Sequence, residues 1–210
     1  MRVDVWSDVL CPWCYIGKRR LEAALARFPH PVEVKWHAFE LDPSAPRSQD
    51  APRPAAERLA RKYRISIAEA QAKLDQMTAT AARDGLDFHF DRAQPGNSFD
   101  AHRLLHLAAA RGVQDALKER LLRAYFTDGE AIADRETLVR LAADAGLDEE
   151  AARAVLFSDA YAAEVRADEE LARTMEVTGV PFFVIDGKYA VAGAQSPDVL
   201  LEALERAASA

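Results

Sequence analysis

Cysteine is the scarcest reactive residue in this sequence, with two copies among 210 residues. The chain therefore cannot build the several disulfides that stabilise small secreted domains. A metal site of four cysteines is excluded for the same reason. Cys11 and Cys14 lie three positions apart, a spacing that random placement gives in only about 1% of cases. The spacing predicts a functional pair, because in a reducing compartment such a pair is redox-active, metal-binding or accidental.

Long hydrophobic runs and an excess of positive charge are also missing. No apolar run approaches the roughly 18 residues needed to cross a bilayer, and no apolar signal core follows Met1 and Arg2. We therefore expect a cytoplasmic protein with no membrane partner. The net charge is −7, with acids and bases interspersed, which argues against nucleic acid as a partner. Hydrophobic residues make up 50% of the chain, enough for a core.

The N-terminal part of the sequence predicts a strand, a helix and a second strand. Residues 2–7 and 32–39 alternate apolar and polar side chains, as half-buried strands do. Between them, residues 12–28 are helix-like, with Pro12 in the first turn, where proline is tolerated. Strand, helix and strand within about 40 residues form a βαβ unit with a parallel strand pair.

Strand signals return near the C-terminus. Residues 182–185 and 189–191 favour strands, and Asp186-Gly187 between them is a two-residue hairpin turn. Ser196-Pro197 then opens a last helix, which is expected to end near Arg206, with serine as the cap and proline at the first position.

The middle of the chain is predicted to be helical after an irregular, proline-rich connection over residues 42–54. Ser66 and Glu69 match a capping box, and Asp134 and Gly146 fit the start and end of one helix. Helices are expected over 55–64, 66–84, 98–111, 113–126, 134–145 and 148–176, with a short extended piece at 87–90. The order predicts an α/β, thioredoxin-like fold (βαβ … ββα) with a large all-helical insertion. Residues 1–42 and 177–210 would form the discontinuous thioredoxin-like domain, and residues 43–176 the insertion.

Four segments of the sequence carry a family resemblance. They are Ser7-Asp8-Val9-Leu10-Cys11-Pro12-Trp13-Cys14, Phe39-Glu40-Leu41-Asp42-Pro43, Asn97-Ser98-Phe99-Asp100-Ala101-His102 and Thr178-Gly179-Val180-Pro181-Phe182-Phe183. Together they resemble the DsbA-like thioredoxin superfamily, and most of all its cytosolic FrnE-like branch of dithiol oxidoreductases. Some FrnE-like proteins carry a second cysteine pair near the C-terminus; this chain has none, which excludes a second relay disulfide.

Cys11 lies where a strand ends and a helix begins, where free backbone N–H groups and the helix dipole stabilise an anion. We assign Cys11 as the nucleophile and Cys14, one turn deeper, as the resolving thiol, since the thiolate is the reactive form. Pro12 and Trp13 would tune the couple. The archetype of the family has histidine where Trp13 stands. We therefore expect the helix start to lower the pKa of Cys11 less than in that archetype.

The resemblance implies that Pro181 follows a cis peptide bond and lies against the disulfide. Cis bonds are essentially confined to X–Pro sequences. The backbone of Val180 would then be free to pair with an extended substrate, as in strand addition. An ordinary trans proline at the start of an edge strand is the structural alternative.

Five polar residues are weaker candidates for the site. Asp8, His37 and Glu40 lie near the C-terminal ends of the parallel strands, the usual ligand side of such sheets. One of them could relay the proton of Cys14, or all could be solvated loop residues. Asn97 and His102 match the branch pattern, and either face substrate or, for Asn97, cap a helix.

No metal and no cofactor are expected beyond the redox-active dithiol, with glutathione as a candidate co-substrate. His102 and His106 share a helix face, but Arg103 stands where a zinc-protease helix has glutamate. A zinc site of four ligands would need both histidines to approach both cysteines.

Three functions remain open at this point. The leading hypothesis is a thiol–disulfide oxidoreductase that reduces, isomerises or oxidises disulfides of proteins and peptides through a mixed disulfide at Cys11. The rival is a glutathione-dependent isomerase or transferase of the 2-hydroxychromene-2-carboxylate isomerase or kappa-class type, although these place serine where Cys11 stands. In that case the Gly193–Ser196 loop could hold a glutathione carboxylate. The third is a peptide-binding module whose thiols are dispensable.

Overall fold

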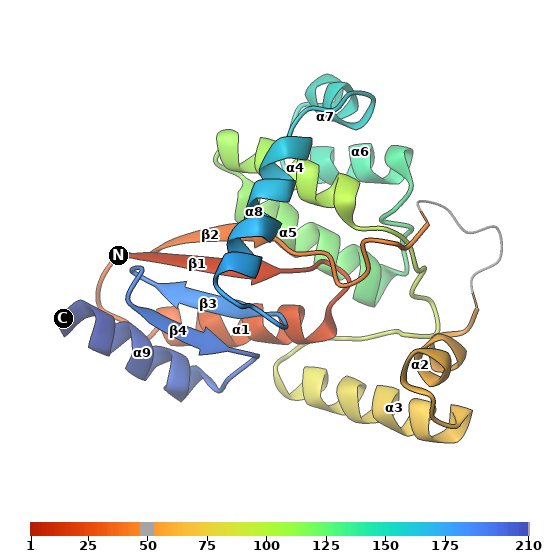
Figure 1. Ribbon diagram of the computed structural model, residues 1–210, viewed down its shortest axis with the longest axis horizontal. Coiled ribbons are helices and arrows are strands. Elements are labelled where there is room, and N and C mark those ends of the chain that lie inside the picture. Colours follow the sequence, from red (N-terminus) through yellow and green to blue (C-terminus); the bar gives the residue numbers. More distant parts are fainter. Residues whose placement is uncertain (47–52, 210) are drawn as a thin grey trace.

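A mixed sheet joins the two ends of the chain in the computed structural model, which describes residues 1–46 and 53–209 (Figure 1). β1 pairs in parallel with β2 and antiparallel with β3, and β3 pairs antiparallel with β4. The spatial order is therefore β2-β1-β3-β4. The strands are β1 (Arg2–Ser7), β2 (Glu33–Ala38), β3 (Phe182–Ile185) and β4 (Tyr189–Ala192). This arrangement confirms the predicted α/β fold.

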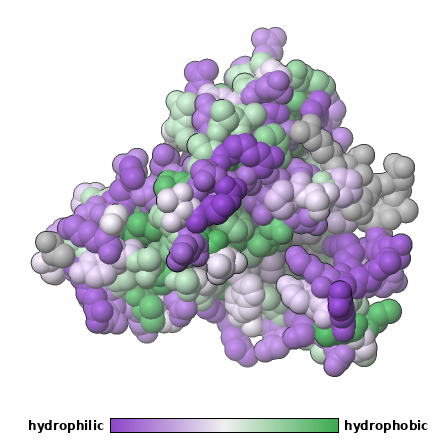
Figure 2. All heavy atoms as spheres, in the orientation of Figure 1, coloured by the Kyte–Doolittle hydropathy of each residue, from purple (hydrophilic) through white to green (hydrophobic). Residues whose placement is uncertain are grey.

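Helices cover both faces of the sheet because side chains of each strand alternate between the faces. Val3 and Val5 of β1 pack with α1 (Pro12–Leu25) and α9 (Pro197–Ser209) on one face. Trp6 points to the other face, against α8 (Ala162–Thr174). In Figure 1, α8 crosses in front of the sheet, and Figure 2 shows hydrophilic side chains along its outer side.

The remaining helices lie in two groups. The larger group packs next to β2 and α1, around a core that includes Leu104, Leu121 and Leu138. It comprises α4 (Phe99–Ala110), α5 (Gln114–Arg123), η1 (Ala124–Asp128), α6 (Arg135–Asp144) and α7 (Glu149–Leu156). No helix in the described ranges combines the length and the apolar character that crossing a bilayer requires.

The smaller group is a hairpin of α2 (Ala55–Tyr63) and α3 (Ile67–Arg83) that stands apart in Figure 1. Its helices pack on each other through a small apolar cluster of their own, centred on Ala60 and Ala70. The predicted capping box is confirmed: Ser66 Oγ accepts from the Glu69 N–H, and the Glu69 carboxylate accepts from the Ser66 N–H. The hairpin therefore has a defined shape of its own beside the main body.

Most predicted element boundaries hold within a few residues, including the Asp186-Gly187 turn, where both residues have positive φ. The extended piece predicted over 87–90 forms no strand: residues 87–89 have no regular secondary structure and residue 90 lies in a turn. The helix predicted over 113–126 ends at Arg123 and continues as a π-helical turn, η1. The irregular connection predicted at 42–54 falls partly on residues 47–52, outside the described residues.

The helix predicted over 148–176 is wrong as one element, because the chain turns between α7 and α8. Arg103, buried on α4, donates to the carbonyls of Val155, Ser158 and Ala160, the last at 2.9 Å. Ser158 Oγ also accepts from the Ala160 N–H at 3.2 Å, which competes with helix continuation. A side chain from another helix thus holds the end of α7 together with a local serine bond, and only the serine could have been read from the sequence.

Candidate active site

Cys11 and Cys14 lie at the start of α1, immediately after the strand β1 and a short turn. Cys11 is the N-cap residue with extended backbone, and the Cys14 N–H donates to its carbonyl at 3.0 Å. Both are free thiols and both are buried, with exposed fractions of 4% and 0%. The helix start therefore holds the two sulfurs on one turn, as their spacing predicts.

The loop before β3 brings Val180 and Pro181 against the first cysteine. The Val180–Pro181 peptide bond is cis, which confirms that prediction. The Cys11 thiol donates to the Val180 carbonyl with an Sγ–O distance of 3.5 Å. The Pro181 carbonyl accepts from the Gly193 N–H at 2.8 Å. Within the described residues no acceptor meets the Val180 N–H, so this donor is free for a substrate backbone.

Gly17 sets how closely this loop approaches α1, and the sequence analysis missed it. A Cβ added to Gly17 would lie 2.7 Å from Pro181 Cγ and 3.4 Å from the Phe183 ring. Real side chains do not tolerate the first distance, so only glycine fits here. A glycine inside a helix costs stability relative to alanine, and that cost is the signal that could have pointed to a close contact.

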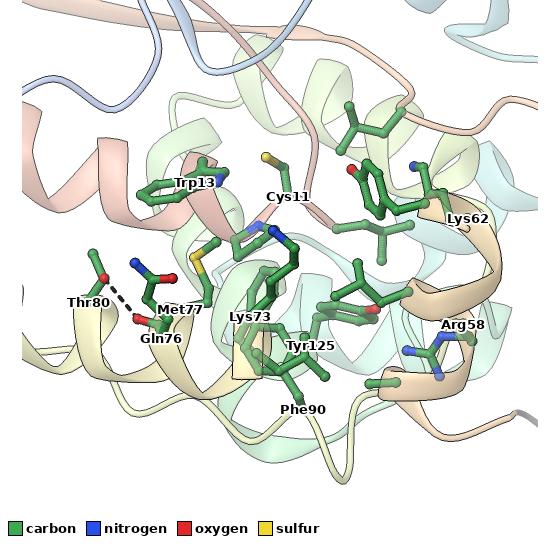
Figure 3. Close-up of a pocket in the computed structure, with 18 of the residues that line it drawn as sticks. Cys11, Trp13, Arg58, Lys62, Lys73, Gln76, Met77, Thr80, Phe90 and Tyr125 are labelled. Atoms are coloured by element: carbon green, nitrogen blue, oxygen red, sulfur yellow. Dashed lines mark hydrogen bonds between the residues drawn. The ribbon is translucent and has the colours of Figure 1, made fainter. Parts of the chain in front are cut away.

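A cavity of about 870 Å³ opens beside Cys11. Figure 3 shows its walls: Trp13 and Cys11 from the start of α1, Met77 and Lys73 from α3, and residues of α2 opposite. Of the two cysteines, Cys11 lines this cavity and Cys14 does not. Trp13 is 42% exposed at the rim. A substrate sulfur can therefore reach Cys11 from the cavity.

The two thiols titrate as a pair. The hydrogen bond with the Cys14 side chain, then burial, raise the pKa of Cys11 well above its ordinary 9.0. Burial also acts to raise the pKa of Cys14, but the hydrogen bond from Cys11, the charge of Lys118 and the Ser7 hydroxyl together lower it. The expected lowering at Cys11 is thus not what the geometry gives. The first negative charge settles on the inner thiol, and a second charge beside it is unfavourable.

The comparison with known families rests on nearly the whole chain, since residues 2–205 match the DSBA-like thioredoxin domain. The chain belongs to the DsbA-like thioredoxin family. This confirms the superfamily to which the four sequence segments point. The chain is thus similar to the DsbA-like oxidoreductases.

Three proteins illustrate what this DsbA-like chain is similar to. A probable DsbA oxidoreductase from Streptomyces coelicolor is 48% identical, with a TM-score of 0.93 over 100% of this chain and 90% of that one. The uncharacterized protein YwbO from Bacillus subtilis is 28% identical over 207 residues, 97% of this chain and 96% of that protein. The cytosolic disulfide reductase DsbM from Pseudomonas aeruginosa, solved with GSH, is 20% identical with a TM-score of 0.69 over 100% of both chains. At that identity the likeness to DsbM shows the fold alone.

Lys118 is a second residue of this DsbA-like site that the sequence analysis missed. It lies on α5 with 0% exposure. Its Nζ donates to the Ser7 carbonyl at 3.4 Å and lies 5.4 Å from the centre of the Trp36 ring. Burial lowers the pKa of Lys118 to about 8, against the opposing charges of Cys14 and Asp8. Lys118 forms no salt bridge with any described carboxylate, so its charge acts on the thiol pair. The signal available in the sequence is a lysine on the apolar face of α5, one turn before Leu122.

Asp8 lies inside the protein rather than in a solvated loop. Its carboxylate accepts from the Leu10 N–H at 3.2 Å and the Leu41 N–H at 2.8 Å, and His102 Nε2 lies 3.6 Å away. Burial acts to raise the pKa of Asp8, but the histidine and the two N–H donors lower it overall. Asp8 therefore stays charged, and it fixes the turn that leads into Cys11.

His37 lies between two carboxylates on the sheet face below α8. Its Nδ1 is 2.6 Å from Asp168 Oδ1 and its Nε2 is 2.7 Å from Asp4 Oδ1. The ring also stacks on Trp6 with centroids 4.4 Å apart. His106 Nε2 lies 3.0 Å from Asp168 Oδ2, so His106 and His102 serve different carboxylates. With both ring nitrogens engaged, His37 ties β2 to α8.

Glu40 and Asn97 form a second buried polar contact near the loop after β2. Asn97 Nδ2 donates to Glu40 Oε2 at 3.2 Å, and Asn97 Oδ1 accepts from the Phe99 N–H at 2.8 Å. Arg166 of α8 donates to the other Glu40 oxygen at 2.6 Å. Burial raises the pKa of Glu40, although Arg166 opposes this. Asn97 lies one residue before Ser98, the N-cap of α4, and holds the start of that helix by accepting from the first helical N–H. The N-cap predicted at Asn97 is therefore wrong by one position.

Proposed function

We propose that this protein is a thiol–disulfide oxidoreductase that works through the Cys11–Cys14 dithiol. The observation that carries the proposal is the pair itself: two free thiols lie within the first turn of α1, and the outer one faces both an open cavity and the Val180 carbonyl. Pro12 and Trp13 separate the thiols and bring an indole ring to the cavity rim. Val180 and Pro181 supply the backbone against which a substrate strand would lie.

The reaction moves two electrons and two protons from the dithiol to the substrate disulfide. Cys11 passes its proton to the Cys14 thiolate and attacks one substrate sulfur as the thiolate, so that an Sγ–S bond forms and the substrate S–S bond breaks. The first substrate thiolate leaves and takes that proton from Cys14, which becomes a thiolate again. The Cys14 thiolate then attacks Cys11 Sγ, the enzyme disulfide forms, and the second substrate thiol is released. Lys118 stabilises the attacking Cys14 thiolate. It can give up its proton once that charge is gone, because its pKa of about 8 falls further without the thiolate.

Reduction or isomerisation of disulfides is the direction we propose, in the cytoplasm and in the manner of the FrnE-like branch. A cytosolic glutathione pool lies at roughly −220 to −320 mV, whereas dithiol enzymes span about −120 to −270 mV. Most such couples would therefore be reduced at rest and act as reductants; net oxidation would need an oxidising partner. Glutathione, as the thiol that regenerates the dithiol, is the proposed co-substrate. The presence of GSH in the structure of the cytosolic reductase DsbM, a protein of the same fold, supports this choice.

The rival function, a glutathione-dependent isomerase, has less support than the oxidoreductase. The reason lies in the loop that would hold a glutathione carboxylate. The Gly193 N–H donates to the Pro181 carbonyl at 2.8 Å, and the Gln195 N–H donates to the Gly193 carbonyl at 2.9 Å. Ser196 Oγ accepts from the Val199 N–H at 3.4 Å. The Gly193 and Gln195 donors are thus engaged within the protein, and Cys11 stands where those isomerases place serine.

The test is equilibration of the protein in graded glutathione buffers, followed by the fluorescence of Trp13 and by mass spectrometry. We expect one redox transition between dithiol and disulfide. The Cys14→Ser variant should accumulate a mixed disulfide with glutathione at Cys11, whereas Cys11→Ser should form none. The proposal fails if neither thiol reacts, or if Cys11→Ser binds glutathione tightly and without a covalent bond, which would favour the isomerase. A peptide-binding module would instead retain its biological activity in the double variant.

A further inference from the structure

The cavity beside Cys11 has walls of two kinds. On one side lie Cys11, Trp13 and the Val180 loop of the thioredoxin-like part, and on the other lie α2 and α3. In Figure 3, α3 contributes Lys73, Gln76, Met77 and Thr80, whereas α2 contributes Arg58 and Lys62. Ligand pockets of small molecules and short peptides have volumes of about 300–1,000 Å³, so 870 Å³ leaves room for a ligand of several residues.

Among the residues that the structure describes, the lining of this cavity carries positive charge and no negative charge. Arg58, Lys62 and Lys73 line it, and none of the described lining residues is aspartate or glutamate. This contrasts with the net charge of −7 for the whole chain. A cleft lined by one sign of charge concentrates ligands of the opposite sign.

Two of these cations are not used by the fold. Lys62 is exposed and forms no salt bridge in the part of the chain that the structure describes. Lys73 is also exposed, and it acts electrostatically on Glu69, one turn away, whose carboxylate is already bonded to Ser66. Arg58 differs, because it donates to the Arg53 carbonyl at 2.6 Å. Lys62 and Lys73 are therefore available to a ligand.

Exposed hydrophobic side chains surround the same opening. Trp13 is 42% exposed, Leu41 is 40% exposed and Tyr63 is 60% exposed, and all three line the cavity. Large apolar side chains gathered at one place on a surface usually mark a binding site. The rim can therefore bury the apolar parts of a ligand while the lysines meet its charges.

We propose that this cavity selects disulfides and thiols that carry carboxylate groups close to the reacting sulfur. Lys62 and Lys73 would pair with the carboxylates, Trp13 and Tyr63 would cover the apolar part, and the sulfur would meet Cys11. The ligand chemistry is an acidic peptide around a cysteine, either a free small peptide or an acidic segment of a protein. This inference rests on the proposed function, because it assigns the substrate class of the same dithiol.

The experiment compares disulfides of different charge at low ionic strength. Oxidised glutathione is anionic, bis(2-hydroxyethyl) disulfide is neutral and cystamine is cationic. Lys62→Gln combined with Lys73→Gln should lower kcat/KM for oxidised glutathione by about tenfold, leave the neutral disulfide unchanged and raise kcat/KM for cystamine. Added salt should weaken the preference of the unaltered protein for the anionic disulfide.

The matched control is Arg61→Gln combined with Arg83→Gln, which removes the same charge from α2 and α3 at exposed positions outside the cavity lining. This control should leave all three rates in their original ratio. A second arm uses disulfide-linked peptides whose cysteine is flanked by glutamates or by lysines. If only the longer peptides show the charge preference, the ligand is an acidic segment of a protein. If oxidised glutathione shows it as well, the ligand is a free small peptide.

The two proposals fail in different ways. If the lysine variant and the control alter all disulfides alike, or if neither arm shows a charge preference, the inference about the cavity is overturned while the oxidoreductase stands. If even the neutral disulfide is not turned over by the unaltered protein, the proposed function fails. Quenching of Trp13 by oxidised glutathione in Cys11→Ser, lost in the lysine variant, would then still support the cavity, and its absence would overturn it.

Discussion

The pyrrolidine ring of Pro181 packs directly on the backbone of Gly17, so that no Cβ fits between α1 and the loop before β3. Through this contact, the helix that carries both cysteines also fixes the position of Val180. The Val180 carbonyl in turn accepts from the Cys11 thiol. Because Gly17 has no side chain, α1 and the loop before β3 can approach closely enough to place Val180 against Cys11.

Gly17→Ala should destabilise the protein by about 1–3 kcal/mol, the usual cost of overpacking, and should lower disulfide turnover. Alanine normally stabilises the middle of a helix by ~1 kcal/mol relative to glycine. A loss of stability in Gly17→Ala would therefore show that the contact with Pro181 outweighs the helix preference of alanine. Denaturant unfolding and an insulin-reduction assay measure both effects. Gly179→Ala, whose Cβ would meet nothing within 4 Å, is the control for stability. A more stable and fully active Gly17→Ala protein would contradict the account.

Lys118→Met should raise the pKa of Cys14, because it removes the positive charge that helps to lower it. The rise of the reductase rate with pH should move to higher pH, with about a tenfold loss at neutral pH if ~1.4 kcal/mol of thiolate stabilisation is lost. Replacing a buried charge with an apolar side chain is often neutral or stabilising, so misfolding is not the expected cause. Lys188→Met, an exposed position on the β3–β4 turn, is the matched control. An unchanged pH profile would remove Lys118 from the mechanism.

The lowered pKa of Lys118 predicts how the stability of the folded protein depends on pH. Its pKa of about 8 lies below the ordinary 10.5, because burial disfavours the ammonium. The folded state therefore binds fewer protons than the unfolded state between these values, and Lys118 makes stability rise with pH there. Cys11, Cys14, Asp8 and Lys18 act on the same group. The difference between the unaltered protein and Lys118→Met, measured by unfolding across this range, isolates the lysine.

Asp168→Asn should destabilise the protein by about 2–3 kcal/mol, since buried hydrogen bonds to a charged group are lost. Asp168 accepts from the Ala38 N–H at 2.9 Å and meets His37 and His106. Burial acts to raise the pKa of Asp168, but these partners lower it well below 3.8. Its contribution is therefore complete above the ordinary pKa and is lost as the pH falls below it. Thermal unfolding at several pH values measures this loss. Asp198→Asn, which breaks an exposed pair with Arg27, should cost at most ~0.5 kcal/mol, and equal losses in both variants would refute the prediction.

Local signals in the sequence were sufficient for the architecture and for the centre of the site. The Cys11–Cys14 spacing and the Asp186-Gly187 turn each have a chemical meaning within a few residues, whereas the cis bond before Pro181 was predicted from the family resemblance. The spacing and the turn depend on backbone geometry that neighbours in the chain determine. They could be interpreted without knowledge of which helices meet.

Residues whose role depends on distant parts of the chain could not be predicted. Lys118 reaches the carbonyl of Ser7, and Gly17 meets Pro181, only after the helices have packed. Arg103 ends α7 through carbonyls more than 50 positions away in the chain. His37 lies in β2, as the alternating pattern predicts, yet its two ring nitrogens are hydrogen-bonded to Asp4 and Asp168. In each case tertiary contacts override what the local pattern indicates.

The contact between Cys11 and Val180 joins residues 169 positions apart, with consequences for a chain that is still being made. The cysteines leave the ribosome early, whereas β3 and the loop that meets Cys11 leave near the end. Until then β1 lacks its central antiparallel neighbour, and the thiols have neither the carbonyl that meets Cys11 nor a complete cavity. Until the last part of the chain has been made, Cys11 therefore lacks the residues Gly179 and Val180, which lie beside it in the folded protein.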